Sequence, residues 1–330
     1  MAPVSVDDIR RARERVAGIA VETPLVPAVN LGAPSGVELW LKAENLQRTG
    51  SFKIRGAANA VASLNEMQRA RGVITYSSGN HGQAVACAAH LAGVGSVVVM
   101  PEDAIPLKVA ATRRWGAEVV FAGHTSLDRQ ERAMHLVEEH GYAVIPPFDD
   151  PRIIAGQGTT GLEILEQLPE VETVVVPVGG GGLISGIAIA VKELNPKVCV
   201  IGVEPEGAAD AQESLHGGSL VTWERVETVA DGLRTSRVGD LNFATIREYV
   251  DDIVTVSEEE ILRAVGILAM GAKLVAEPSG ATAPAAALSG RISVPAGRMA
   301  VVISGGNIAP ERLAARVEAA SLSAAAVSSA

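Results

Sequence analysis

The segment TVVVPVGGGGLISGIAIAVKEL, residues 173–194, decides the fold class, because it joins a strand pattern to a helix pattern through four consecutive glycines. The β-branched run TVVVPV predicts a buried strand, and LISGIAIAVKEL has the length and apolar spacing of a helix. Glycines let successive backbone N–H groups converge at a helix N-terminus, where the helix dipole also favours an anion. The segment therefore predicts an α/β protein with a phosphate site after this strand. A tight glycine turn without a ligand is the alternative interpretation.

Residues 71–145 repeat this alternation of strand and helix. Short β-branched runs lie in GVITY, SVVVM and AEVVFA, and helix patterns begin near Asn80, Ile105 and Ser126. Strands that alternate with helices of this length favour a parallel sheet with helices on both faces. We expect these residues to form a small, mobile α/β domain.

A second unit begins after IPPFDDP, residues 145–151, whose prolines and aspartates interrupt the pattern. Its strands are expected in TVVVPV, VCVIGV and MAVVIS, with helices between them. The chain has 330 residues, of which 48% are hydrophobic, and single cores stop growing at about 250–300 residues. We therefore expect residues 1–70 and 146–330 to form one large, discontinuous domain, with a ligand cleft between it and the small domain.

Composition limits the classes of partner. The formal net charge is -10 and no basic run stands out, which argues against nucleic acid and anionic membranes. No apolar run approaches the roughly 18 residues of a membrane span, and the charged N-terminus is not a signal segment. Cys87 and Cys199 have neither redox nor zinc spacing and are expected in apolar surroundings. We expect a cytoplasmic protein that acts on a small molecule.

The glycine run also partly fits a dinucleotide-binding fingerprint. Gly180 and Gly182 are spaced as in that motif, and Glu204 closes the next expected strand about twenty residues on. Ser185 stands where the third glycine belongs, so the fingerprint is defective. An NAD-dependent oxidoreductase is the alternative from a different class.

Two further loops follow expected strands and carry polar side chains. Residues 76–89, YSSGNHGQAVACAA, offer Ser77, Ser78 and Asn80 at a helix N-terminus, which suits a carboxylate or ordinary N-capping. Residues 301–307, VVISGGN, end a strand in Ser304 and two glycines. Ligands in open α/β sheets gather beyond the carboxyl ends of strands, so the three loops can face one cleft. Lys53, in TGSFKIRGA, has the pattern of a surface lysine when that stretch is considered alone.

Seven stretches together resemble the fold-type II pyridoxal-phosphate enzymes, from about residue 20 to 310. The closest subgroup is the short, catabolic type of threonine dehydratase together with serine racemase. The resemblance implies a tryptophan synthase β-like fold, with two open, twisted, mostly parallel sheets, helices on both faces and the cofactor in the interdomain cleft. The stretches are ENLQRTGSFKIRGA, SSGNHGQAVA, PFDDPRIIAGQGT, PVGGGGLISG, GVEPEGAADA, ADGLRT and SGGN.

The resemblance assigns roles to individual residues. Lys53 is implied to hold pyridoxal phosphate as a Schiff base, a chemistry that needs an amine with a depressed pKa. Phe52 would lie against the pyridine ring, Asn80 would bond the ring hydroxyl, and Ser304 would face the ring nitrogen. The phosphate cup would be Gly179, Gly180, Gly181, Gly182 and Leu183; the loop for the substrate carboxylate would be Ser77, Ser78, Gly79, Asn80 and His81.

The implied reaction is β-elimination from L-threonine or L-serine, giving 2-oxobutyrate or pyruvate with ammonia. A neutral hydroxyl at Ser304 makes the cofactor a weaker electron sink than an aspartate would, which favours elimination over transamination. Ser78 also matches the residue that protonates the opposite face in racemases. Serine racemisation and 3-hydroxyaspartate dehydration are therefore the alternatives within the family.

Glu204, Ala208 and Asp210 stand at the spacing of the subgroup's cation site. Oxygen ligands alone would suit Mg²⁺ or Ca²⁺, and an acidic, solvated loop is the other interpretation. The family also implies a homo-oligomer, either a dimer or a tetramer. The lack of a C-terminal regulatory extension argues against feedback control of the biosynthetic type.

Overall fold

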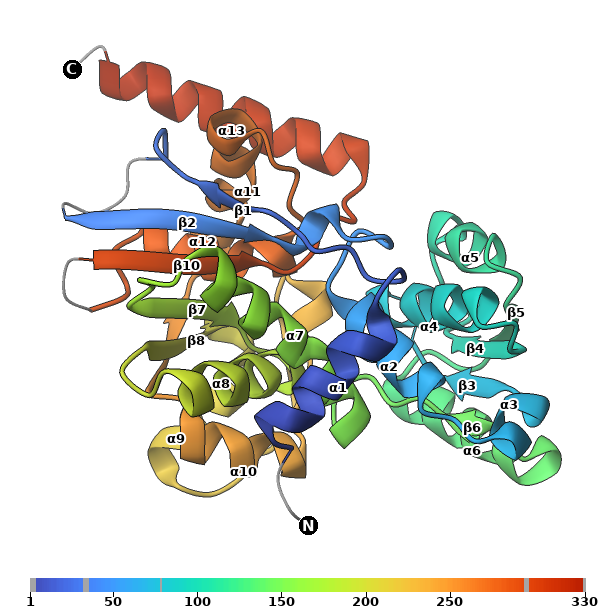
Figure 1. The fold of residues 1–330 in the computed structure, drawn as a ribbon. Helices are drawn as coiled ribbons and strands as arrows, with labels where there is room; N and C mark the ends of the chain where they lie inside the picture. The colour runs from blue at the N-terminus through green and yellow to red at the C-terminus, as the bar shows by residue number, and fades with distance from the viewer. Residues whose placement is uncertain (1–3, 32–35, 78, 294–296, 329–330) are drawn as a thin grey trace.

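The structure is a computed structural model that describes residues 4–31, 36–77, 79–293 and 297–328. It contains two sheets, one of six strands in the order β1-β2-β10-β7-β8-β9 and one of four in the order β5-β4-β3-β6. In Figure 1 the smaller sheet and its helices lie to one side of the larger sheet. Among the described residues, no helix is long and apolar enough to cross a membrane.

The large sheet is parallel except for its first strand. β1 pairs with β2 in the antiparallel sense, and the other neighbours are parallel. β2 lies between β1 and β10, so the N-terminal part of the chain joins the same sheet as the C-terminal part. Its strands are β1 (Leu25–Pro27), β2 (Val37–Ala43), β7 (Thr173–Pro177), β8 (Cys199–Pro205), β9 (Asp252–Val256) and β10 (Gly297–Ile303).

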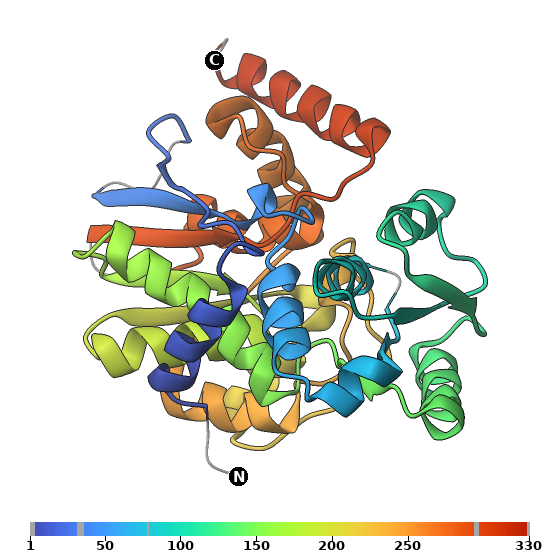
Figure 2. The same cartoon turned by 45° about the vertical axis from the view of Figure 1, so that its right-hand side comes forward.

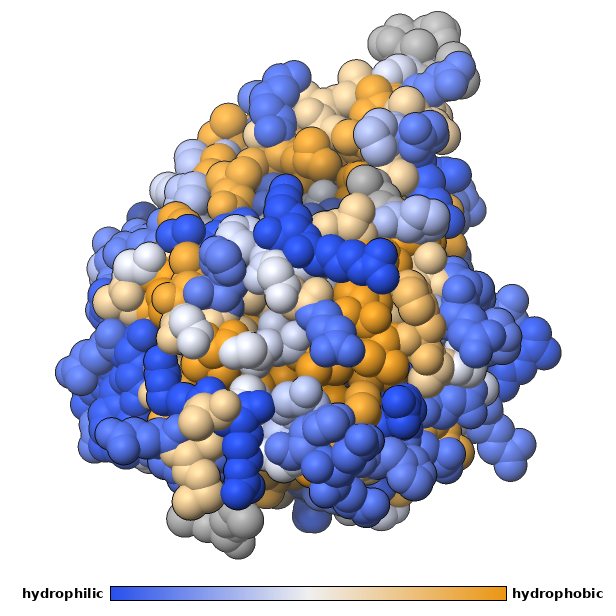
Figure 3. Space-filling view, turned by 90° about the vertical axis from the view of Figure 1, so that its right-hand side faces the viewer, coloured by the Kyte–Doolittle hydropathy of each residue, from blue (hydrophilic) through white to orange (hydrophobic). Residues whose placement is uncertain are grey.

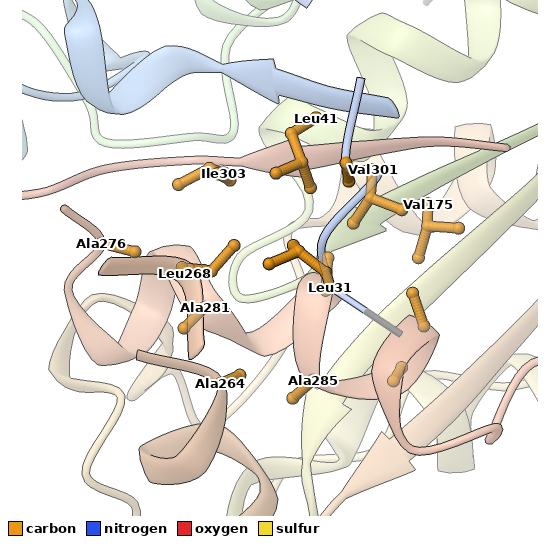
Figure 4. Packing of buried hydrophobic residues seen from close by; sticks show 14 of the residues in the cluster. Leu31, Leu41, Val175, Ala264, Leu268, Ala276, Ala281, Ala285, Val301 and Ile303 are labelled. Atoms are coloured by element: carbon orange, nitrogen blue, oxygen red, sulfur yellow. The ribbon is translucent and has the colours of Figure 1, made fainter. Parts of the chain in front are cut away.

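Helices cover both faces of the large sheet because its strands are apolar on both faces. Along β10, Met299, Val301 and Ile303 pack in one cluster with α11 and α12, while Ala300 and Val302 pack in another with α7, α8 and α10. This division follows from the alternation of side chains along a strand. Figure 4 shows Leu41, Val301 and Ile303 above Leu268 and Ala281 in the first of these cores.

The helices of this part have the following bounds: α1 (Val6–Val16), α2 (Lys53–Ala62), α7 (Pro151–Gln167), α8 (Gly182–Leu194), α9 (Asp210–Gly217), α10 (Asp240–Tyr249), α11 (Glu258–Ile267), α12 (Pro278–Leu288) and α13 (Pro310–Ser328). Short 3-10 turns lie at η1 (Glu44–Leu46), η2 (Glu206–Ala208) and η3 (Asp231–Leu233). Figures 1 and 2 both place α13 at the edge of the molecule, beyond α11.

The small sheet is wholly parallel and lies between residues 73 and 144. α6 packs on one face through Ala133 and Leu136, and α4 and α5 lie on the other, where Ala86 and Val109 contact β4. The elements are α3 (Glu66–Arg71), β3 (Val73–Thr75), α4 (Asn80–Leu91), β4 (Ser96–Met100), α5 (Pro106–Arg113), β5 (Glu118–Phe121), α6 (Ser126–His140) and β6 (Ala143–Val144).

The expected α/β architecture, with two mostly parallel sheets and helices on both faces, is confirmed. A shared apolar cluster joins the small sheet and its helix α4 to α2, since α2 contributes Ile54 and Val61 to a core that contains Val73 of β3 with Val85 and Cys87 of α4. Seen from the side of the small sheet, the periphery is largely hydrophilic and hydrophobic residues gather nearer the middle (Figure 3).

Candidate active site

Lys53 is the first residue of α2 and lies beside the carboxyl end of β10. The backbone N–H of Phe52 donates to the carbonyl of Ser304 at 3.0 Å, and Ser51 forms a β-bridge with Gly305. Two segments about 250 residues apart in sequence are thereby held together. Lys53 and Ser304, both predicted site residues, lie on these joined segments.

The amine of Lys53 is turned into the protein. Its Nζ donates to the carbonyl oxygen of Pro147 at 2.7 Å and lies 5.2 Å from the centroid of the Phe52 ring. Burial lowers the pKa of Lys53 to about 8. A substantial fraction of this amine is therefore neutral near physiological pH, which a nucleophile or base requires.

The glycine loop between β7 and α8 is buried and tightly enclosed. Gly181 is the N-cap of α8 with φ +91°, a conformation that side chains disfavour. A Cβ on Gly180 would lie 2.3 Å from the Phe148 ring. The first N–H groups of a helix have no partner within the helix, so the N–H groups at the start of α8 are available to an anion.

One short segment contacts both the glycine loop and Lys53. Phe148 packs over Gly180 and Gly182, and its neighbour Pro147 accepts the bond from Lys53. The structure thereby brings the predicted phosphate cup and the predicted lysine to the two sides of residues 147–148. The Asn242 side chain stabilises the glycine loop by donating from Nδ2 to the carbonyl of Gly180 at 2.8 Å.

The start of α4 contacts the chain just before Pro147, through His81 and Ile145. Gly79 donates its N–H to Ser77 Oγ at 3.3 Å. His81 is 3% exposed, and its Nε2 lies 3.0 Å from the carbonyl of Ile145. Burial, with a smaller contribution from the charge of Lys53, lowers the pKa of His81 to about 3. His81 is therefore neutral, with Nε2 as the donor; Ser78 lies outside the described residues.

Asn80 is held by two residues whose part in the site the sequence analysis missed. Its Nδ2 donates to Glu277 Oε1 at 2.5 Å, and its Oδ1 accepts from Asn307 Nδ2 at 2.8 Å. These bonds fix which end of the amide faces which neighbour. Burial, and then the charge of Asp231, raise the pKa of Glu277 to about 8.

Ser304 ends β10 as a buried, uncharged residue. Its side chain is in contact with the carbonyl of Ser279, with Oγ to O at 3.4 Å. Lys53, the glycine loop, the α4 loop and Ser304 thus surround one region at the ends of parallel strands, where α/β proteins bind ligands.

Glu204, near the end of β8, and Asp210, the first residue of α9, form a separate acidic pair. Glu204 accepts from the N–H groups of Ala211 and Gln212 at 3.1 and 2.7 Å. Both carboxylate oxygens of Asp210 are buried, and the nearby backbone N–H groups of Asp210 and Val238 offset part of the effect of that burial on its pKa. Burial raises the pKa of both groups, that of Asp210 to about 7. Within the described part of the chain no three His, Cys, Asp or Glu side chains gather as a metal site.

A half-buried lysine of lowered pKa near a glycine loop that can bind an anion is typical of α/β enzymes that use a phosphorylated group in covalent catalysis. The chain belongs to the pyridoxal-phosphate dependent enzyme family, whose model matches residues 16–305. The expected family is confirmed. The dinucleotide alternative rested on the glycine run and on Glu204, and the family match decides against it.

Relatives with three different named activities cover nearly all of the chain. An L-threonine ammonia-lyase of Thermotoga maritima is 46% identical over 92% of this chain and 76% of its own length. An L-threo-3-hydroxyaspartate ammonia-lyase of Saccharomyces cerevisiae is 42% identical over 93% of this chain and 94% of its own. The structure of maize serine racemase superposes with a TM-score of 0.92 at 36% identity, covering 96% of this chain and 98% of that one.

Proposed function

We propose that this protein is a pyridoxal-phosphate-dependent lyase that dehydrates and deaminates L-threonine, L-serine or both, to 2-oxobutyrate or pyruvate and ammonia. The observation that carries the proposal is the Lys53 amine, whose pKa burial lowers to about 8 beside the glycine cup. The match to a threonine ammonia-lyase over most of the chain supports the same reaction.

The residues present fit the cofactor. The N–H groups of Gly179, Gly180, Gly181, Gly182 and Leu183 would hold its phosphate. Phe52 would lie against its ring, Asn80 would donate to its ring hydroxyl, and Ser304 would face its ring nitrogen. When bound, pyridoxal phosphate supplies the electron sink that makes the substrate α-carbon acidic.

The chain's own groups would then bind the substrate and move its proton. Ser77, Ser78, Gly79, Asn80 and His81 would bind the substrate carboxylate at the start of α4, where N–H groups favour an anion. Lys53 Nζ, neutral in a useful fraction near pH 8, would take the α-proton. The uncharged Ser304 would favour loss of the β-hydroxyl over transamination.

A substrate panel tests the activity. We expect release of ammonia and the matching 2-oxo acid from L-threonine or L-serine, with a kcat/KM higher than that for 3-hydroxyaspartate and higher than that for serine racemisation. A faster reaction with 3-hydroxyaspartate would assign the activity of the yeast relative instead. Faster formation of D-serine would make racemisation the main activity.

We also propose a cation site at Glu204, Ala208 and Asp210, for Mg²⁺ or Ca²⁺. The proximity of two buried carboxylates, Glu204 and Asp210, supports it. The Ala208 carbonyl and waters would complete an oxygen shell. Either ion should raise the melting temperature after chelation, because a ligand that binds only the folded state stabilises it. Asp210→Asn should remove that response. An unchanged melting temperature after exhaustive chelation and on adding either ion would show that the pair binds no cation.

For the domain arrangement, we propose residues 71–145 as a small mobile domain and residues 1–70 with 146–330 as the cofactor-binding domain. The confinement of one sheet to residues 73–144 supports this division. We further propose a cytoplasmic homo-oligomer, a dimer or tetramer. The free thiols of Cys87 and Cys199 are consistent with a reducing compartment.

A further inference from the structure

Four charged side chains are buried together where the first turn of α2 packs on β2, η1 and α7. They are Lys42 of β2, Glu44 of η1, Arg55 of α2 and Glu163 of α7, and each is at most 5% exposed. We call them the buried quartet. With two cations and two anions the quartet is neutral, so it places no net charge near Lys53.

Arg55 is the centre of the quartet. Its Nε and Nη2 donate to Glu44 at 2.7 and 2.8 Å, and its Nη1 and Nη2 donate to Glu163 at 2.5 and 2.8 Å. Lys42 Nζ completes the set by donating to Glu163 at 2.6 Å. A single guanidinium therefore donates two hydrogen bonds to each of two carboxylates. Arginine can form such bidentate bonds and lysine cannot.

Electrostatics keep Glu44 and Arg55 ionised in spite of burial, whereas burial is the largest effect on Lys42 and lowers its pKa. Burial alone would raise the pKa of Glu44, but the charge of Arg55 holds that pKa below its ordinary value. Burial disfavours a charged Arg55, but Glu44 and Glu163 hold its pKa above the ordinary value. Buried ion pairs commonly add little stability compared with apolar residues of similar size. A role in fixing the position of α2 on α7 accounts better for the burial of four charged side chains.

The quartet controls the orientation of the first turn of α2. An α-helix advances about 100° per residue, so side chains two residues apart leave it on nearly opposite sides. Arg55 points into the core, which turns Lys53 toward Pro147. The N-cap residue Phe52 makes no side-chain capping bond, so Arg55 is the side chain that holds this turn through hydrogen bonds, beside the apolar packing of Ile54.

The close packing of α2 on α7 brings Arg55 within reach of Glu163. A Cβ on Gly156 of α7 would lie 2.6 Å from both the carbonyl oxygen of Arg55 and the Cα of Gly56. The backbones of the two helices therefore touch at the level of Arg55. Thr159, one turn further along α7, is a third partner and accepts a bond from Arg55 Nη1 at 3.0 Å.

We propose that Arg55 is a positioning residue, which holds the first turn of α2 so that the Lys53 amine stays buried against the Pro147 carbonyl. This rests on the proposed role of Lys53, but it concerns the amine itself and can be measured without the cofactor. The consequence is that weakening Arg55 exposes the amine to water and makes it more basic, because burial is what lowers its pKa.

Competitive acetylation of the full-length, cofactor-free chain, read by peptide mass spectrometry across pH, tests this. In the wild type the Lys53 amine should titrate near pH 8. In Arg55→Lys we expect that pKa to rise by about one unit or more, so that the acetylation rate at pH 7, taken relative to the high-pH plateau of the same variant, falls about tenfold. Other charges around the amine stay constant, since the substituted residue is still cationic and His81 is neutral.

Arg13→Lys is the matched control. Arg13 also grips a glutamate of α7 through two nitrogens, but the pair is exposed. The Lys53 pKa should not move in this variant. Melting curves separate loss of folding from loss of position. If Arg55→Lys does not fold, Glu44→Asp, which keeps the charge but shortens the side chain that Arg55 binds, should give a smaller rise in the same direction.

An unchanged Lys53 pKa in whichever of these two variants folds overturns the proposal and leaves the quartet a stabilising feature only. The measurement is independent of the proposed reaction. If Lys53 titrates near pH 8 and responds to Arg55, but pyridoxal phosphate is attached elsewhere, the positioning role stands and the proposed function fails.

Discussion

Lys53→Ala should lose at least about 10³-fold in the rate of 2-oxo acid formation, because one amine both holds the cofactor and moves the α-proton. The fold should persist, since removing a buried amine of lowered pKa relieves a desolvation cost. The measurements are the turnover of L-threonine and L-serine, the cofactor's visible absorbance, and a melting curve for folding.

Lys197→Ala, at an exposed lysine, is the matched control and should retain wild-type turnover. Added methylamine should restore part of the activity of Lys53→Ala by supplying a small base in the space left by the side chain. Turnover within about tenfold of the wild type in Lys53→Ala would show that another group does this chemistry.

Gly180→Ala should weaken the binding of pyridoxal phosphate at least about tenfold. The added Cβ would lie 2.3 Å from the Phe148 ring, and overpacking of this kind costs about 1–3 kcal/mol of folding free energy. If Phe148 moves, Pro147 moves with it, and the carbonyl that holds Lys53 Nζ at 2.7 Å is displaced. Cofactor affinity is measured by titration of absorbance, and stability by urea unfolding.

Gly217→Ala is the control, since no heavy atom lies within 4 Å of a Cβ there and its φ is outside the left-handed region. It should bind cofactor as the wild type does. Phe148→Leu combined with Gly180→Ala should recover part of the lost affinity by making room. Undiminished affinity in Gly180→Ala alone would contradict the description of a closely fitted cup.

The parts of the site that local sequence could predict are those whose chemistry lies in one continuous loop. The glycine run between β7 and α8 predicts its own geometry, because the strand, the turn and the helix N-terminus are contiguous. The loops at Ser77 and Ser304 follow apolar strands, and parallel strands end at one edge of a sheet, so their convergence was predictable as well.

Residues that act across long sequence distances could not be found this way. Glu277 stands before a proline at the start of α12, a position where an exposed capping acid is common. Its burial and its bond to Asn80, 197 residues away, have no local signal. The same is true of Arg55 and Glu163, which are 108 residues apart.

The C-terminal end is more helical than its low-complexity sequence predicts, because alanine has a high helix propensity. The low-complexity sequence SLSAAAVSSA suggests a frayed tail, but α13 continues to Ser328. Alanine has the highest helix propensity, and the earlier part of α13 packs on α11, where a Cβ on Gly266 would lie 2.4 Å from the carbonyl of Arg316. A helix anchored in this way extends through an alanine-rich sequence at little cost.

Borohydride reduction of the cofactor-loaded protein, followed by peptide mapping, tests the central claim most directly. The account predicts a single pyridoxyl-labelled peptide, with the label on Lys53 of TGSFKIRGA. A label on any other lysine, or full cofactor absorbance that reduction fixes to no residue, would contradict it.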